Sequence, residues 1–430
     1  MKRVIRAGVI PLVLCLVLVV TSCCGGGTAA NEIKVGIVGP MDFIQGEHHW
    51  HGAQMAADEI NAAGGIMVGG EAYQIRLVQV DTNEILSVTD ATSAMERAIT
   101  VDDVHFLAGG FRTEAVFPMQ EIAMDYERIF MGCGSATKEL CDGVGEDYDR
   151  YKYWFRITPI NNIYLVTVDF MLIQTVADAL RDECGIETPK VAILAEKLTW
   201  ADPMVALAEV KLPSMGMELV GTWRPSDTAT DVEAELTAIE DAGAQIIFTT
   251  FSGPVGISYA RQWGELQIPA ASVGINVEAQ KQGFWDATGG NGEYEMTLNT
   301  YARVEISDLT IPFYDEFVDE TGEIPTYNAG TYEALYILKE AIEAADSLDT
   351  DAVVAAMEDT DHMGTAGRIM FDEDHDVVWG AGYVTGLGVQ WRDGEMECVW
   401  PPSDGSWEGV VYEGSVDYEL PPWVIDAWAD

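Results

Sequence analysis

The chain has 430 residues, 48% of them hydrophobic, and carries 71 acidic against 23 basic side chains, for a formal net charge of −48. The hydrophobic content excludes a disordered chain, and the length favours two lobes over a single core. The charge excludes nucleic acid as a partner, because phosphate binding needs clustered cations and no basic stripe follows Arg6.

Residues 1–22 have the pattern of an export signal, with Lys2, Arg3 and Arg6 before an apolar stretch too short for a comfortable membrane span. The segment ending at Cys23 resembles the lipobox of bacterial-type lipoproteins. The resemblance implies cleavage before Cys23, a lipid on that cysteine and an extracytoplasmic protein anchored at the outer face of the cytoplasmic membrane. Residues 23–31 would be a flexible tether. An ordinary signal peptide or an uncleaved anchor helix is the alternative.

Short apolar runs alternate with helical patterns along most of the remaining chain. The pattern predicts strands at 33–38 and 73–80 and from Val104 and Ile129, with helices between them. It begins again near Lys190, with strands expected at 191–194, 218–223, 245–250 and 270–274. This alternation predicts parallel, doubly wound sheets. Two such sheets indicate two lobes that face each other across a cleft.

Two strands of the first half end in glycines followed by hydroxyl residues. Gly110 precedes Thr113, and Gly134 precedes Ser135. Small ligands bind where the carboxyl ends of parallel strands meet, so Thr113 and Ser135 are candidate ligand contacts. The alternative is that these hydroxyls cap the next helices and touch no ligand.

The order of several motifs resembles the leucine/isoleucine/valine-binding protein family, which are extracytoplasmic solute receptors of ABC importers. These motifs are Gly39-Pro40, Gly52-Ala53, INAAGGI at 60–66, SATKEL at 135–140 and FRITP at 155–159. The motifs QWRDG at 390–394, VWPP at 399–402 and PPW at 421–423 resemble the ends of many members.

The resemblance implies an α/β type I periplasmic-binding fold, in which two doubly wound lobes joined by a three-strand hinge close on a ligand. We expect residues 32–157 and 283–345 in lobe 1, and residues 158–282 and 346–430 in lobe 2. The implied function is delivery of a small polar ligand, an amino acid or amide, to ABC permease subunits. The same fold would also serve a receptor that signals to a membrane partner and transports nothing.

The resemblance also assigns ligand contacts. In lobe 1, Thr113, Gly134, Ser135 and Thr137 would hold a carboxylate through hydroxyls and backbone N–H groups. Arg112 departs from the family pattern and would either pair with that carboxylate or lie solvated at the rim. The resemblance implies three further contacts. Trp200 and Phe251 would be aromatic walls of the opposite lobe, with core packing as the alternative for both, and Gln45 would reach the ligand from the loop after the first strand.

The acidic contact to a ligand's ammonium group is missing where the resemblance places it. After strand 270–274 the family has a glutamate, whereas this chain has Asn276, with Glu278 two residues later. Asparagine brings no charge to an ammonium group. Asn276 as a ligand contact therefore predicts an amide, a urea-like compound or a carboxylate in place of an ordinary α-amino acid.

The remaining motifs indicate no catalysis, metal or cofactor. The cysteine spacing fits no zinc pattern, and the histidines at 48, 49 and 51 lack an identified carboxylate partner. The motifs for phosphate, acyl-transfer and zinc-peptidase chemistry are absent from the sequence, so an enzyme is not expected. In an oxidising compartment, Cys133 and Cys141 are the local candidates for a disulfide.

Overall fold

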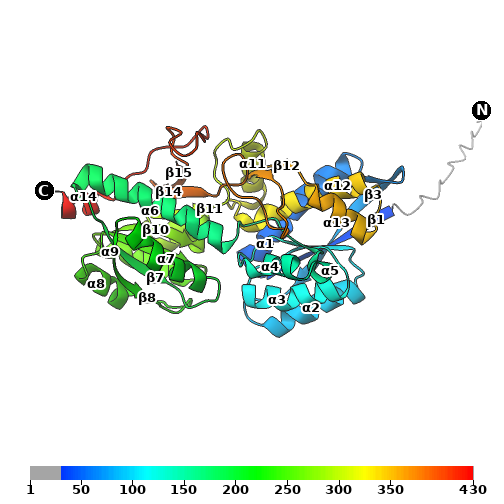
Figure 1. Ribbon diagram of the computed structural model, residues 1–430, viewed down its shortest axis with the longest axis horizontal. Helices are drawn as coiled ribbons and strands as arrows, with labels where there is room; N and C mark the ends of the chain where they lie inside the picture. The colour runs from blue at the N-terminus through cyan, green and yellow to red at the C-terminus, as the bar shows by residue number, and fades with distance from the viewer. Residues whose placement is uncertain (1–30, 430) are drawn as a thin grey trace, which may run out of the picture.

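The computed structural model describes residues 31–429, which form two α/β lobes arranged along the long axis of the molecule (Figure 1). The predicted fold class is confirmed. The expected export signal, the expected lipid site at Cys23 and residues 24–30 of the expected tether lie outside the described residues.

Lobe 1 is built on a sheet with strand order β2-β3-β1-β4-β5-β6, in which every neighbouring pair is parallel except β2 and β3. Helices α1, α12 and α13 lie on one side of this sheet, and α2 and α3 lie on the other (Figure 1). Because helices cover both faces, β4, β5 and residues 35–39 of β1 consist of apolar residues and glycine. The strands are β1 (Asn31–Gly39), β2 (Ile66–Val68), β3 (Glu71–Asp81), β4 (Phe106–Gly109), β5 (Phe130–Gly132) and β6 (Trp154–Arg156). The helices are α1 (Ile44–Ala62), α2 (Val88–Thr100), α3 (Thr113–Asp125), α4 (Glu139–Glu146), α5 (Tyr148–Tyr151), α12 (Thr331–Ala345) and α13 (Thr350–Glu358).

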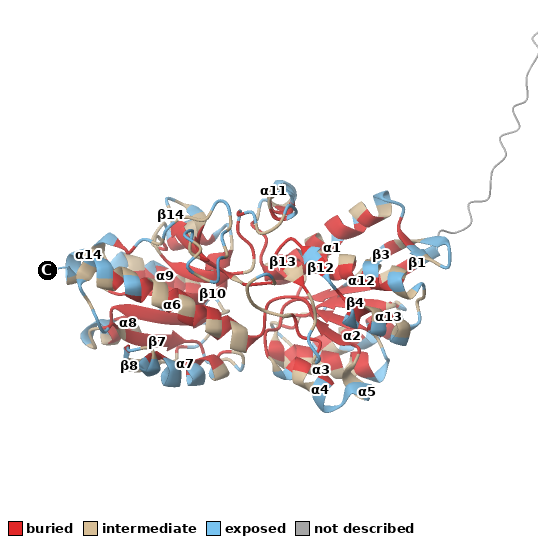
Figure 2. Cartoon of the chain, turned by 45° about the horizontal axis from the view of Figure 1, so that its top comes forward, coloured by how far each residue is buried: buried red, intermediate tan, exposed pale blue. Residues whose placement is uncertain are grey.

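Lobe 2 is built on a sheet with strand order β15-β14-β11-β10-β9-β7-β8, whose last two strands in sequence are antiparallel. Its strands are β7 (Lys190–Ala195), β8 (Glu218–Trp223), β9 (Ile246–Phe251), β10 (Ala271–Asn276), β11 (Met296–Asn299), β14 (Leu387–Arg392) and β15 (Glu395–Trp400). Its helices are α6 (Asn162–Cys184), α7 (Asp202–Ser214), α8 (Glu233–Asp241), α9 (Val255–Leu266), α10 (Phe284–Thr288) and α14 (Pro422–Trp428). Figure 2 shows the central strands of both sheets buried beneath helices whose outer faces are exposed, whereas the edge strand β8 is only partly buried.

Helix α6 is, among the described residues, the helix long and apolar enough to cross a membrane. In the structure it packs against β9, β10 and β11 as a core helix of lobe 2, and 56% of its most apolar window is buried. Its ends are fixed by capping: the Asn161 side chain accepts from two backbone N–H groups at the start, and Gly185 adopts the left-handed conformation at the end.

The strand pairing corrects two of the expected lobe boundaries. Residues 283–299 were expected in lobe 1, but β11 pairs with β10 and continues the sheet of lobe 2. The first part of 346–430 was expected in lobe 2, but α13 packs on α12 of lobe 1. The chain therefore passes between the lobes at residues 157–161, 300–309 and 370–386. The helix α11 (Thr310–Thr321) and the hairpin of β12 (His362–Gly364) and β13 (Gly367–Ile369) lie between the second and third passages.

Candidate functional site

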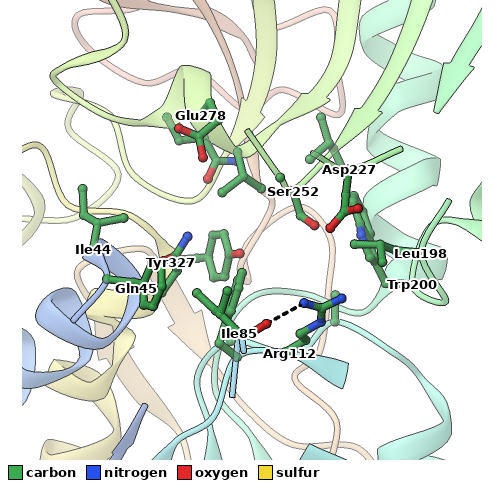
Figure 3. Close-up of a pocket in the computed structure, with 18 of the residues that line it drawn as sticks. Ile44, Gln45, Ile85, Arg112, Leu198, Trp200, Asp227, Ser252, Glu278 and Tyr327 are labelled. Carbon is green, nitrogen blue, oxygen red and sulfur yellow. Dashed lines mark hydrogen bonds between the residues drawn. The ribbon is translucent and has the colours of Figure 1, made fainter. Parts of the chain in front are cut away.

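A cavity of about 500 Å³ lies between the lobes, where loops leave the carboxyl ends of strands from both sheets. Much of its wall is apolar, with Ile44 and Ile85 from lobe 1 and Leu198, Ile275 and Leu298 from lobe 2. Six charged side chains also line it: Asp42, Arg112, Glu114, Asp227, Glu278 and Lys281. Figure 3 shows how several of these side chains converge from the two lobes.

The lobe 1 wall offers a cradle of backbone donors in the loop after β5. The N–H groups of Gly134, Ser135, Ala136 and Thr137 donate to no acceptor in the described part of the chain, and Gly134 and Ala136 line the cavity. Thr113, the first residue of α3, also lines it, and its hydroxyl lies 2.9 Å from that of Ser135. Free N–H groups beside a helix N-terminus form a site suited to an anion.

Arg156 holds this cradle from behind. Its guanidinium is fully buried and donates to the carbonyl oxygens of Ser135 and Thr137, while its Nε donates to Asp376 at 2.8 Å. Because a trans peptide unit directs its C=O and N–H in opposite directions, the bond to the Ser135 carbonyl turns the Ala136 N–H away from Arg156. The buried ion pair thus also links β6 to the third passage between the lobes.

Glu84 organises the neighbouring loop of lobe 1, which carries Arg112. Its carboxylate is buried and accepts from the N–H of Arg112 at 2.8 Å, from the N–H of Phe111 and from the Thr82 hydroxyl at 3.0 Å. Burial raises the pKa of Glu84 to about 7. The Arg112 guanidinium lines the cavity and donates to the Ile85 carbonyl at 3.0 Å (Figure 3).

Glu196 organises the cavity loops of lobe 2 in the way that Glu84 organises the loop of lobe 1. Its buried carboxylate accepts from the Trp200 indole N–H at 2.8 Å, from the Ser252 hydroxyl and from the Gly253 N–H at 3.0 Å. Burial raises the pKa of Glu196. Trp200 and Ser252 both line the cavity, so this carboxylate fixes two groups that face a ligand.

The structure brings five of the predicted contacts to the cavity: Arg112, Thr113, Gly134, Trp200 and Gln45. Ser135 lies behind Thr113, and the Thr137 hydroxyl donates to Glu139 instead of facing the cavity. Phe251 is fully buried and packs on Tyr259, with ring centroids 5.3 Å apart. For Phe251 the core-packing alternative therefore holds.

Asn276 is turned into lobe 2 and does not line the cavity. Its Nδ2 donates to Glu295 at 2.7 Å and to the Gly256 carbonyl at 3.2 Å, and its Oδ1 accepts from the Glu278 N–H. Side chains alternate along β10, so Ile275 lines the cavity in place of Asn276, and Val277, the first residue after β10, lines it as well. This corrects the expected ligand contact, and with it the argument from Asn276 against an α-amino acid.

The expected disulfide is also corrected. Cys133 and Cys141 are buried free thiols with separate partners: the Cys133 thiol donates to the Met131 carbonyl, and the Cys141 sulfur accepts from the Trp154 indole at 3.3 Å. His48 and His49 lie at the buried start of α1, and burial lowers the pKa of His48 to about 3 and the pKa of His49 to about 4. Within residues 31–429, no group of three or more His, Cys, Asp or Glu side chains is arranged to hold a metal ion.

Four residues that shape the site were missed by the sequence reasoning: Glu84, Arg156, Glu196 and Asp227. Glu196 lies two residues after the predicted strand 191–194 and directly follows the observed β7, a position typical of a cleft residue. Arg156 belongs to the quoted FRITP motif, but its role depends on distant partners such as Asp376. Asp227 and Glu84 lie in loops that carry no comparable signal.

Comparison with known proteins supports the same fold over most of the chain. A family model described as "Periplasmic binding protein" matches residues 32–388. Leu/Ile/Val-binding protein homolog 7 of Brucella abortus is 23% identical over 398 residues, covering 88% of this chain and 93% of the relative. A structure assigned to a branched-chain amino acid ABC transporter of Silicibacter pomeroyi superposes with a TM-score of 0.74 at 19% identity, covering 92% of this chain and 100% of the other. The substrate-binding protein LivJ of Streptococcus pneumoniae, in complex with isoleucine, superposes with a TM-score of 0.69 at 19% identity, covering 86% and 99%.

Proposed function

The chain belongs to the periplasmic binding protein family, and from this premise we propose that it is the solute-binding protein of an ABC importer for α-amino acids with apolar side chains. The family and fold are those of extracytoplasmic solute receptors, not of enzymes. The relatives named for leucine, isoleucine and valine, and the neighbour in complex with isoleucine, support this ligand class.

The observation that carries the proposal is the cavity between the lobes. A ligand carboxylate would accept from the free N–H groups at Gly134 and Ala136 and from Thr113 on lobe 1. Its apolar side chain would lie against walls such as Ile44 and Leu298, and its ammonium group would meet the acidic side of lobe 2. A ligand that touches both walls binds the closed form better than the open form, and therefore shifts the lobes toward closure.

The partners follow from this function. The closed form would be presented to membrane-embedded permease subunits, and a lipid on Cys23 would keep the protein at the outer face of the membrane. Mass spectrometry of the protein exported by its native host checks the anchor: the proposal expects an N-terminal Cys23 carrying a diacylglyceryl group. An N-terminus at another residue would contradict it.

The ligand class is tested on the chain from Asn31 onward, which contains the whole described fold. We expect leucine, isoleucine and valine to raise the melting temperature, because they bind the folded state and not the unfolded state. The amides of the same amino acids lack the carboxylate and should give no shift at equal concentration. Binding of the amides alone, or of no amino acid, would overturn the proposal.

A glycine pair gives a matched control for the cradle. A Cβ added at Gly134 would lie 2.2 Å from the Gly110 carbonyl oxygen, so Gly134→Ala must displace the loop. At Gly283, an added Cβ meets nothing within 4 Å. Isothermal titration should show that Gly134→Ala lowers the affinity for leucine by about tenfold or more, the scale of one charge-assisted hydrogen bond. Gly283→Ala should leave the affinity unchanged. Equal affinity of the two variants would place the carboxylate elsewhere.

A further inference from the structure

Two carboxylates of lobe 2 line the cavity, and they lie at opposite sides of it. Asp227 lies next to Ser252 and above Arg112, whereas Glu278 lies on the side of Ile44 and Gln45 (Figure 3). The proposed function requires one of them to receive the ligand's ammonium group. Their surroundings differ enough to decide which.

The charge of Glu278 is already neutralised within the wall. Its Oε1 accepts from the Lys281 ammonium at 2.7 Å, and the two side chains are only 12% and 16% exposed. A ligand ammonium group that took Glu278 would leave Lys281 largely buried without its partner, and an unpaired buried charge is strongly unfavourable. Glu278 and Lys281 are therefore better suited to form a neutral, polar part of the wall.

Asp227 has no such partner. In the described part of the chain, no Lys, Arg or His nitrogen lies within 4 Å of its carboxylate, and the side-chain contact it has is the Ser226 hydroxyl at 3.2 Å. Its position is nevertheless fixed. The Asp227 carbonyl accepts from the Val255 N–H at 3.0 Å. The Asp227 Cβ packs so closely on Gly253 that a Cβ added to this glycine would lie 3.0 Å from it.

The groups around Asp227 suit a cation. Ser252 and Trp200 line the same side of the cavity, and both are held by the buried carboxylate of Glu196. An indole face attracts an ammonium group, and the Ser252 oxygen can accept from one. Across the cavity, Arg112 of lobe 1 lies below Asp227 (Figure 3), and Arg112 directly precedes Thr113 of the proposed carboxylate site.

We propose that Asp227 is the specificity-determining residue that binds the ammonium group of the ligand. The inference rests on the proposed function. An α-amino acid carries its two charges on one carbon. Asp227 lies above Arg112 (Figure 3), which directly precedes Thr113, where the proposed function places the carboxylate. The apolar side chain then extends toward Ile44, and the Glu278–Lys281 pair closes that end of the cavity without giving up its own ion pair.

The test combines two isosteric variants with two probes in isothermal titration at pH 7. The probes are leucine and 4-methylpentanoate, which is leucine without its amino group. We expect Asp227→Asn to lower the affinity for leucine by about 10- to 100-fold, the scale of a charge-assisted hydrogen bond. Its affinity for 4-methylpentanoate should stay within about threefold of that of the unsubstituted protein. Glu278→Gln removes the other carboxylate but leaves Lys281 unpaired in the wall, so any loss of affinity should be smaller than for Asp227→Asn and equal for leucine and 4-methylpentanoate.

The outcomes separate the inference from the proposed function. If the unsubstituted protein binds leucine and Asp227→Asn binds it equally well, or if a loss specific to leucine appears in Glu278→Gln instead, Asp227 does not bind the ammonium group and the proposed function stands. If Asp227→Asn lowers the affinity for leucine and for 4-methylpentanoate equally, the residue acts on the shape of the cavity and the inference fails. If the unsubstituted protein binds no amino acid, both fail.

Discussion

Glu295, just before β11, shows what a buried carboxyl group without a cation does at the residue scale. The side chain is fully buried; Asn276 donates to Oε1 at 2.7 Å, and Oε2 has no partner within the described residues. Burial raises the pKa of Glu295 from 4.5 to about 8. The group is therefore mostly a neutral acid at pH 7, and Asn276 serves to tie β10 to the start of β11.

This pKa shift predicts how stability depends on pH. Between pH 4.5 and 8 the folded state keeps the Glu295 proton that the unfolded state loses, so the free energy of unfolding falls as pH rises through this window. Glu295→Gln keeps the acceptor for Asn276 and cannot ionise. We expect it to be more stable than the unsubstituted protein by up to a few kcal/mol at pH 8.5 and about equal at pH 5, measured by urea denaturation.

Glu265 provides the control, because it is exposed at the end of α9. Glu265→Gln should shift stability equally at both pH values. If Glu295→Gln were destabilising by the same amount at pH 5 and pH 8.5, Glu295 would be ionised in the folded state and would not be a neutral acid at pH 7.

At the scale of elements, the β12–β13 hairpin is attached to α12 by a buried ionic cluster. Glu333 of α12 is fully buried and accepts from the Thr365 N–H at 2.6 Å and from His362 Nε2 at 2.9 Å. His362 Nδ1 lies 3.1 Å from Glu340. Burial alone would lower the pKa of His362, but the bonds to Glu333 and Glu340 outweigh it and raise the pKa to about 9.

The cluster predicts a loss of stability in alkali. A histidine whose folded pKa is raised from 6.5 to about 9 stabilises the fold fully below pH 6.5, and this contribution disappears as pH rises through 9. His362→Gln should therefore be less stable at pH 6 by up to about 3 kcal/mol, with a difference that shrinks toward pH 10. Chemical denaturation at several pH values measures it. A difference that did not vary with pH would show that His362 is neutral in the fold.

Hydrogen exchange would locate the effect. The backbone N–H groups of β12 and β13 should exchange faster in His362→Gln than in the unsubstituted protein at pH 6, while those of β9 and β10 in the other lobe should not change. Faster exchange throughout both lobes would mean that the cluster supports the whole fold and not the hairpin.

For the whole molecule, the dominant electrostatic property is the net charge of −48. Like charges at this density repel one another and favour expanded states. Added salt shortens the screening length from about 10 Å at 0.1 M to about 3 Å at 1 M. We therefore expect the melting temperature to rise between these concentrations, to a similar degree with NaCl and KCl. A melting temperature that stayed constant or fell would contradict this.

The sequence by itself determined the fold class and the location of the cleft. Apolar runs alternating with helical patterns require parallel sheets, and glycines at the ends of two strands marked the loops that carry Thr113 and Gly134 to the cavity. These features are local: a strand that is buried on both faces, and a loop that turns sharply after it, leave their pattern in consecutive residues.

Only the tertiary structure decided which way individual side chains face and which lobe each late segment joins. A strand covered on both sides carries no alternation that marks which of its faces lies toward the cavity. The sequence therefore does not show whether Ile275 or Asn276 faces the cavity, and a shift of one residue moves a side chain from the cavity into the core. The roles of Glu84, Arg156 and Glu196 depend on partners from other loops, and β11 joins lobe 2 through pairing with β10. Such contacts join residues distant in the chain, and no local pattern records them.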